Sequence, residues 1–142
     1  MKKKLSCILL IDDDEPTNYL NQITLEQADC ARSVKVVQSG QDALDFLSRQ
    51  GKYRELSECP HPELIFLDIN MPAMDGWEFL GKYRQLPVQQ KARIVMIMLT
   101  TSLNPDDETR ARSMPEIDGF EHKPLKAERL REVLRTHFPD TV

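Results

Sequence analysis

Short apolar runs alternate with amphipathic stretches along the whole chain. Five runs have the character of β-strands and lie at Leu5–Ile11, Ser33–Val37, Leu64–Leu67, Arg93–Leu99 and Ile117–His122. The first of them is nearly continuous in apolar residues, which is typical of a strand that is buried on both faces of a sheet. The pattern therefore predicts strands that lie inside a sheet rather than on a solvated surface.

Helix signals follow each predicted strand. Pro16 suits the first turn of a helix, Ser39-Gly40-Gln41-Asp42 resembles a capping box, and Asn104 is a capping residue followed by Pro105. The predicted helices run from Pro16 to about Asp29, from Ser39 to about Leu47, from Trp77 to Leu86, from Asn104 to Met114 and from Leu130 to Phe138, with a polar loop from Gly51 to Pro62. Five β–α units with short connections predict an α/β fold with a doubly wound, five-stranded parallel sheet and five helices.

Composition and charge narrow the class of protein. A chain of 142 residues fits one domain, and its net charge of −4 gives no sign of a nucleic-acid-binding surface. No stretch approaches the roughly 20 apolar residues of a membrane span. The basic start and the short apolar run after it are cut off by Asp12-Asp13-Asp14, so we expect no signal peptide. Three widely spaced cysteines are expected to be reduced thiols of a cytoplasmic protein: Cys7, Cys30 and Cys59.

Candidate chemistry lies where the predicted strands end. Asp12-Asp13-Asp14 follows the first strand, Asp68 the third, Thr100-Thr101-Ser102 the fourth and Lys123 the fifth. The carboxyl ends of parallel strands lie along one edge of the sheet, where such sheets bind ligands. Each group alone has an ordinary explanation as a helix cap, a turn residue or a surface side chain. Together, carboxylates, a hydroxyl and an ammonium at one edge suit a divalent metal and a phosphoryl group.

Four segments in this order resemble the receiver domains of two-component response regulators: Ile8–Asp14, Phe66–Trp77, Val95–Ser102 and Gly119–Pro124. The resemblance covers essentially the whole chain. It implies a flavodoxin-like sheet with strand order 2-1-3-4-5 and a single receiver domain over residues 1–142, with a core at about 5–138 and no output domain. The region from Ala43 to Ile65 is similar to that of small stand-alone receivers paired with phytochrome-type kinases.

The resemblance also implies a role for each site residue. Asp68 is the expected phosphoacceptor, and Mg²⁺, with Mn²⁺ as an alternative, is expected on Asp12, Asp13, Asp68 and the backbone carbonyl of Asn70. The expected phosphate-binding and switch residues are Thr100, Lys123 and Phe120, and the expected modulating residues are Thr101 and Ser102. Many receivers carry a smaller alanine where this chain has Thr101, so its β-branched side chain is expected to restrict access to the phosphoryl group.

General chemistry supports these residue types independently of the resemblance. Mg²⁺ prefers octahedral oxygen coordination and keeps several waters, so one or two carboxylates with phosphate oxygens suffice. A carboxylate such as Asp68 is a competent nucleophile because it needs no deprotonation at neutral pH. An ammonium such as Lys123 offsets the repulsion among three clustered carboxylates, which would otherwise raise one another's pKa.

The sequence therefore predicts a single-domain response regulator rather than an ordinary enzyme. We expect it to take its phosphoryl group from a histidine kinase or a histidine phosphotransfer protein, to catalyse its own phosphorylation and dephosphorylation, and to signal to an unidentified protein as a monomer or weak homodimer. No nucleic acid or membrane partner is expected. A haloacid-dehalogenase-type phosphatase is the alternative, but it would need an acid where Asn70 stands. A flavodoxin would need a phosphate-binding loop after Ile11, and a degenerate receiver would lack part of the site.

Overall fold

The computed structural model has five parallel strands in one sheet, in the order β2-β1-β3-β4-β5. It describes residues 3–53, 61–91 and 94–141. The strands are β1 (Ile8–Ile11), β2 (Val34–Val37), β3 (Leu64–Leu67), β4 (Val95–Thr100) and β5 (Gly119–His122). This arrangement confirms the predicted fold class and the strand order that the receiver resemblance implied.

Six α-helices are present in the described part of the chain, one more than predicted. They are α1 (Glu15–Ala28), α2 (Gly40–Ser48), α3 (Gly76–Tyr83), α4 (Val88–Lys91), α5 (Pro105–Arg112) and α6 (Ala127–His137), with 3₁₀ turns at Gly51–Tyr53 and Pro139–Thr141. The predicted helix to Leu86 instead ends at Tyr83, because the proline ring of Pro87 disfavours a helical conformation at the preceding residue. Pro87 then starts the additional single turn α4, since its carbonyl accepts from the Gln90 N–H at 3.0 Å.

The strand boundaries differ from the prediction at several ends. Leu5 forms only an isolated bridge with Ala31, so β1 begins three residues later than expected. Thr100 belongs to β4, and β5 begins at Gly119 rather than Ile117. The predicted start at Arg93 and most of the predicted loop from Gly51 to Pro62 lie outside the described residues. At Leu5 and Ile117 the predicted strand is therefore longer than the segment that pairs in the sheet.

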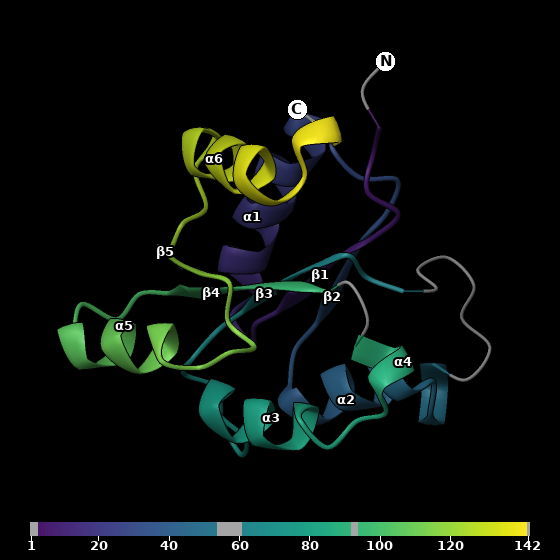
Figure 1. Ribbon diagram of the computed structural model, residues 1–142, viewed down its shortest axis with the longest axis vertical. Coiled ribbons are helices and arrows are strands. Elements are labelled where there is room, and N and C mark those ends of the chain that lie inside the picture. The colour runs from purple at the N-terminus through teal and green to yellow at the C-terminus, as the bar shows by residue number, and fades with distance from the viewer. Residues whose placement is uncertain (1–2, 54–60, 92–93, 142) are drawn as a thin grey trace.

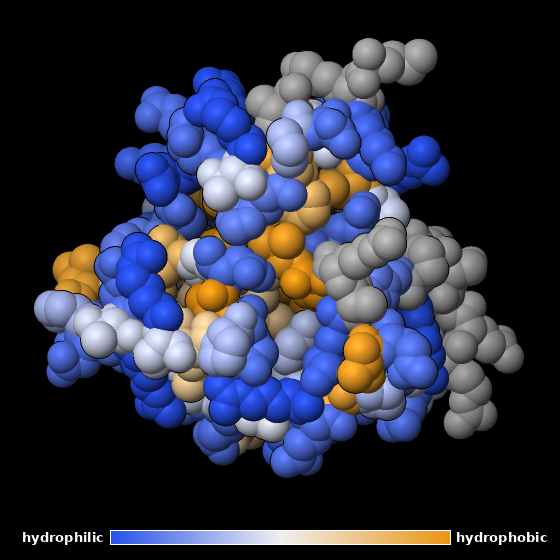
Figure 2. Space-filling view, viewed as in Figure 1, coloured by the Kyte–Doolittle hydropathy of each residue, from blue (hydrophilic) through white to orange (hydrophobic). Residues whose placement is uncertain are grey.

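The strands separate two hydrophobic cores by the alternation of their side chains. Leu9 and Ile11 of β1 belong to the core under α2 and α3, whereas Ile8 and Leu10 belong to the core under α1 and α6. Successive side chains of a strand point to opposite faces, so a strand covered on both faces is apolar throughout. Figure 1 shows α1 and α6 on one side of the sheet and α2 and α3 on the other. In Figure 2 the helical layers are mainly hydrophilic outside, with hydrophobic residues visible between them.

The cysteines correct one expectation. Cys7 is disulfide-bonded, so the prediction of a reduced thiol is wrong for this residue. Cys30 is a free, buried cysteine, and burial raises the pKa of its thiol. Cys59 lies outside the described residues. In the described ranges, no helix has the length and apolar character needed to cross a membrane.

A substitution at Gly76 tests how closely the start of α3 approaches the backbone at the end of β3. A Cβ atom at Gly76 would lie 2.6 Å from the carbonyl oxygen of Asp68 and 3.0 Å from Cα of Ile69, which are backbone atoms that cannot rotate away. We expect Gly76→Ala to lower the free energy of unfolding by about 1–3 kcal/mol, the usual cost of overpacking. Urea denaturation measures this change.

Gly81 provides the matched control in the same helix, since a Cβ there meets nothing within 4 Å. Gly81→Ala should raise stability by about 0.5–1 kcal/mol, because alanine is the better helix former. Equal effects of the two substitutions would contradict the close approach at Gly76.

Candidate functional site

The predicted polar residues meet at the carboxyl edge of the sheet because the strands pair in register. Ile11 at the end of β1 is opposite Leu67 at the end of β3, so the next residues, Asp12 and Asp68, follow neighbouring strand ends. The Asp68 N–H donates to the Ile11 carbonyl at 3.0 Å, which continues the ladder into the site. Lys123 follows β5, and its N–H donates to the carbonyl of Thr100 at 2.9 Å. The carboxyl ends of β1, β3, β4 and β5 thus lie side by side at one edge of the sheet.

A buried ammonium bridges two buried carboxylates at the centre of this edge. Nζ of Lys123 lies 2.5 Å from Oδ2 of Asp12 and 2.9 Å from Oδ1 of Asp68. The three side chains are only 8%, 6% and 5% exposed, respectively. Charged hydrogen bonds of this kind are strong when the groups are held in place, and neither carboxylate is tolerated at such burial without a partner.

The pKa values of Asp68 and Lys123 are both raised, for different reasons. Burial raises the pKa of Asp68 and the nearby charge of Asp12 adds to this effect, although Lys123 and the Asn70 N–H oppose it. Burial disfavours the ammonium of Lys123, but hydrogen bonds to Asp12 and Asp68 outweigh it, so the pKa of Lys123 is raised. The positive charge of Lys123 faces two negative charges, so the ammonium is strongly stabilised. Each carboxylate has only a share of that one positive charge, so its own charge is less well balanced. Lys123 is therefore a cation at neutral pH.

The acidic residues form a set that fits a divalent cation. Asp12, Asp13 and Asp68 each offer one carboxylate oxygen, and these oxygens lie within 4.8 Å of one another. Asp13 is exposed, so the set opens to solvent on one side. Hard divalent cations prefer such oxygen ligands, and three carboxylates facing one ammonium leave two negative charges for a cation to neutralise. Asn70 is exposed beside this cluster.

Asp14, the third acid of the first strand end, has a different role. It is the N-cap of α1, and its side chain accepts from the Thr17 N–H at 3.2 Å. The Asp14 N–H in turn donates to Oδ1 of Asp12 at 3.0 Å, which helps to orient that carboxylate. The ordinary explanation as a helix cap is thus right for Asp14 but does not extend to Asp12.

Thr100 is fully buried at the end of β4 and is connected to α5 by hydrogen bonds. Its Oγ1 accepts from the Ser102 N–H at 3.1 Å, and the Ser102 hydroxyl donates to Oδ2 of Asp107 at 2.5 Å. Asp107 is in the first turn of α5. Thr101 is exposed.

Phe120 is already inside the protein in this structure. The residue is 8% exposed and belongs to the core under α2 and α3, and its ring meets that of His122 edge-on at 5.5 Å. The aromatic ring that is expected to act in the switch is therefore largely buried in this structure.

Two buried asparagines on α1 were not anticipated from the sequence. The buried residues of α1 are Asn18, Asn21 and Leu25, whereas Leu20 is 52% exposed. Nδ2 of Asn18 donates to the carbonyl of Asp12 at 2.9 Å, so this helix contacts the site directly. The sequence carries one signal for this burial, since positions 18 and 21 lie on the same helical face as Leu25, a core residue.

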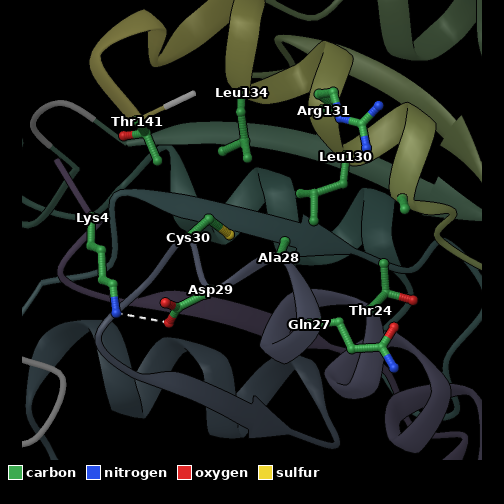
Figure 3. Close-up of a pocket in the computed structure, with 11 residues that line it drawn as sticks. Lys4, Thr24, Gln27, Ala28, Asp29, Cys30, Leu130, Arg131, Leu134 and Thr141 are labelled. Carbon is green, nitrogen blue, oxygen red and sulfur yellow. Dashed lines mark hydrogen bonds and ion pairs between the residues drawn. The ribbon is translucent and has the colours of Figure 1, made fainter. Parts of the chain in front are cut away.

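A separate cavity of about 550 Å³ lies between α1 and α6 (Figure 3). Its lining includes Lys4, which is ion-paired with Asp29 at 2.7 Å, and the buried Cys30. Lys4 precedes β1 and Cys30 follows α1, so this end of the cavity is at the amino-terminal edge of the sheet. Among the described residues, those that line it include none of the predicted site residues, so the cavity is separate from the carboxylate cluster.

Comparison with known proteins decides the family. A sequence model of the response regulator receiver domain matches residues 8–135. The chain belongs to this family. It is 37% identical over 100 residues to the response regulator Rcp1 of Synechocystis sp., an alignment that covers 70% of this chain and 65% of that protein's length.

Solved receiver structures agree with the fold. A two-component response regulator from Cytophaga hutchinsonii superposes with a TM-score of 0.84 at 29% identity, covering 96% of this chain and 99% of that one. The Mn²⁺-bound form of Rcp1 gives 0.70 at 29% identity, covering 92% and 90%. The phosphorylated cyanobacterial phytochrome response regulator RcpA gives 0.72 at 27% identity, covering 92% and 89%. The similarity to phytochrome response regulators predicted from the loop region is confirmed.

Removing the ammonium of Lys123 tests the electrostatics of this receiver site. In metal-free buffer at pH 7, Lys123→Met should lower the free energy of unfolding by about 3–5 kcal/mol, because two buried carboxylates lose their cation. Without the ammonium, the pKa of Asp68 lies further above its unfolded value, because burial raises it and Lys123 no longer opposes that effect. The folded variant binds more protons than the unfolded chain, and its deficit shrinks as the pH falls toward that pKa. Urea denaturation at pH 7 and pH 5 measures both effects.

The exposed Lys126, three residues further along the chain, supplies the control, because it makes no side-chain cap bond to α6. Lys126→Met should change stability by less than about 0.5 kcal/mol at either pH. A Lys123→Met deficit that is the same at both pH values would contradict the electrostatic interpretation.

Proposed function

We propose that this receiver domain accepts a phosphoryl group on Asp68 in a Mg²⁺-dependent step and signals by contact with another protein. The observation that carries the proposal is the buried Asp12–Lys123–Asp68 network beside the exposed Asp13. A nucleophilic carboxylate, an ammonium and a divalent-cation ligand set are the parts that phosphoryl transfer requires. The similarity to a Mn²⁺-bound and to a phosphorylated response regulator supports the same conclusion.

In the proposed reaction, one oxygen of Asp68 attacks the phosphorus of a phosphohistidine. The new P–O bond forms as the P–N bond breaks, and the imidazole leaves with the electron pair of that bond. Lys123 leaves its two carboxylate partners and donates to the phosphoryl oxygens, where negative charge is concentrated. Attack of water on the acyl phosphate later returns Asp68 to a carboxylate and releases inorganic phosphate.

Asp12, Asp13, Asp68 and the Asn70 carbonyl would hold the Mg²⁺, with Mn²⁺ as a substitute. When bound, the cation neutralises charge on the phosphoryl oxygens and on the carboxylates. The residues present fit this group because their oxygens converge within 4.8 Å and carry excess negative charge. The ammonium of Lys123 partly balances that charge before the cation arrives.

The output begins at Thr100. The phosphoryl group adds about −1.5 to −2 charges and three acceptor oxygens, and the Thr100 hydroxyl is a donor at the neighbouring strand end. Turning this hydroxyl toward the phosphoryl group gives up the hydrogen bond from Ser102, which is joined to α5 through Asp107. Since Phe120 is largely buried beforehand, the change in the loop before α5 is the larger part of the response. Thr101 and Ser102 would modulate access and lifetime.

The partners follow from this chemistry. The donor would be a histidine kinase or a histidine phosphotransfer protein in the cytoplasm, and the target another protein rather than a nucleic acid or a membrane. We propose that the receiver domain acts as a monomer or weak homodimer and catalyses only its own phosphorylation and dephosphorylation.

Labelling with a small phosphodonor tests the phosphoacceptor. With Mg²⁺ and acetyl phosphate, the protein should gain one phosphate that hydroxylamine removes, as measured by intact mass. Asp68→Asn should abolish this label, because an amide cannot form the acyl phosphate. Asp13→Ala should weaken Mg²⁺ binding and slow the labelling.

Asp14→Asn is the matched control for Asp68→Asn. It removes a neighbouring carboxylate, yet asparagine caps a helix as well as aspartate does, so labelling should be normal. Normal labelling of Asp68→Asn would refute the site. Sustained hydrolysis of a sugar phosphate would favour the phosphatase alternative instead.

Hydrogen exchange tests the output route. Thr100→Ala should still accept phosphate but lose most of the phosphate-dependent change in exchange over residues 104–122, because without the hydroxyl there is no hydrogen bond from Ser102 for phosphorylation to break. Thr101→Ala, which alters only the exposed neighbour, should keep that change. Undiminished differences in Thr100→Ala would rule out this route and leave Asp68 as the phosphoacceptor.

A further inference from the structure

Helix α1 buries amides where a helix packed on a sheet ordinarily buries apolar side chains. Asn18 and Asn21 are 4% and 1% exposed and share the inward face of the helix with Leu25. A buried amide is unfavourable unless its polar atoms find partners. The partners of these two amides are therefore informative.

Both amides bind the backbone of segments that carry the site. Nδ2 of Asn18 donates to the carbonyl of Asp12 at 2.9 Å. Oδ1 of Asn21 accepts from the Leu125 N–H at 3.0 Å, and the Thr24 hydroxyl lies 3.1 Å from the Leu125 carbonyl. Leu125 is two residues beyond Lys123. One face of α1 thus holds the backbone at Asp12 and next to Lys123, the two residues whose charged atoms are 2.5 Å apart.

Asn18 also keeps an unused acceptor. Its buried Oδ1 has no hydrogen-bond partner among the described residues. Asn18 and Asn21 line a small internal cavity together with Asp12 and Asp68, and this cavity is too small to admit a water molecule. An unpaired amide oxygen beside two carboxylates costs stability, but it adds negative potential at a cluster suited to a cation.

We infer that Asn18 and Asn21 are positioning residues of the phosphoacceptor site. Asn18 orients Asp12 for the divalent cation, and Asn21 places Lys123 for the phosphoryl group by anchoring Leu125. The inference rests on the proposed function, because it takes Asp12 and Lys123 to serve Asp68. Neither amide contacts the reacting atoms, so each acts through a residue that does.

Magnesium binding to the intact chain tests the role of Asn18 without any phosphoryl transfer. By isothermal titration calorimetry, Asn18→Leu should bind Mg²⁺ about 10-fold more weakly, the usual effect of losing a group that supports a metal ligand. The urea midpoint of the same variant should be unchanged or higher, because the unpaired buried acceptor is gone. A purely structural asparagine would give the reverse result, with lower stability and unchanged Mg²⁺ affinity, and that result would overturn the inference.

Two further variants keep the test decisive. Asn18→Ala removes the same donor with a smaller side chain, and it replaces Asn18→Leu if the leucine prevents folding. Leu25→Val loosens the packing of the same helical face without touching either loop, so Mg²⁺ affinity should remain that of the wild type. Equal weakening by Leu25→Val and the Asn18 variant would overturn the inference, since any loosening of α1 would then suffice.

Asn21 is tested by labelling at saturating Mg²⁺. Asn21→Leu should slow labelling by acetyl phosphate about 10-fold, because the backbone at Leu125, two residues beyond Lys123, loses its hydrogen bond to α1. A wild-type rate would overturn the assignment of Asn21. If Asp68→Asn still accepted phosphate, the proposed function would fail, yet the Mg²⁺ result for Asn18 would stand or fall independently.

Discussion

The ion-pair network of Lys123 with Asp12 and Asp68 is the interaction on which the rest of the site depends. Two carboxylates that are almost fully buried at one sheet edge repel each other and have lost most of their hydration. The ammonium of Lys123 between the two carboxylates offsets this repulsion. One ammonium does not neutralise the cluster, because Asp12, Asp13 and Asp68 together carry three negative charges. The same excess of negative charge that limits stability therefore favours binding of a divalent cation.

The fold supplies this geometry mainly through backbone. Register between β1 and β3 sets Asp12 beside Asp68, and the close approach at Gly76 joins α3 to the end of β3. On the opposite side of the sheet, α1 binds the backbone at Asp12 and Leu125 through two buried amides. Polar contacts to backbone are directional, so they hold a position more narrowly than apolar packing does. The charged side chains of the cluster are thus placed by backbone contacts from elements outside it.

The surface at α5, which would carry the signal, is held by fewer buried contacts than the site. Of the residues in α5, only Ala111 is buried, and the helix meets α3 through the guanidinium of Arg110, 4.3 Å from the ring centre of Trp77. Ser102 and Asp107 connect its first turn to Thr100. A helix held by few buried contacts is easily shifted, because little free energy opposes its displacement. The site is anchored by α1 and α3, while α5 is left responsive.

The sequence by itself determined the five strands, their order by family resemblance, and the polar residues at the strand ends, because burial on both faces leaves continuous apolar runs that stop where the chain turns. The roles of Asp68, Thr100 and Lys123 came from resemblance and remain proposals. Only the tertiary structure decided which groups pair and which are buried. It showed that two carboxylates share Lys123 and that Cys7 is in a disulfide. It also showed that Asn18, Asn21 and Phe120 are buried. Lys123 is far in sequence from both of its carboxylate partners, so no local pattern shows their pairing. The spacing of Asn18 and Asn21 puts them on the helical face of Leu25, but an amide side chain does not by itself indicate burial.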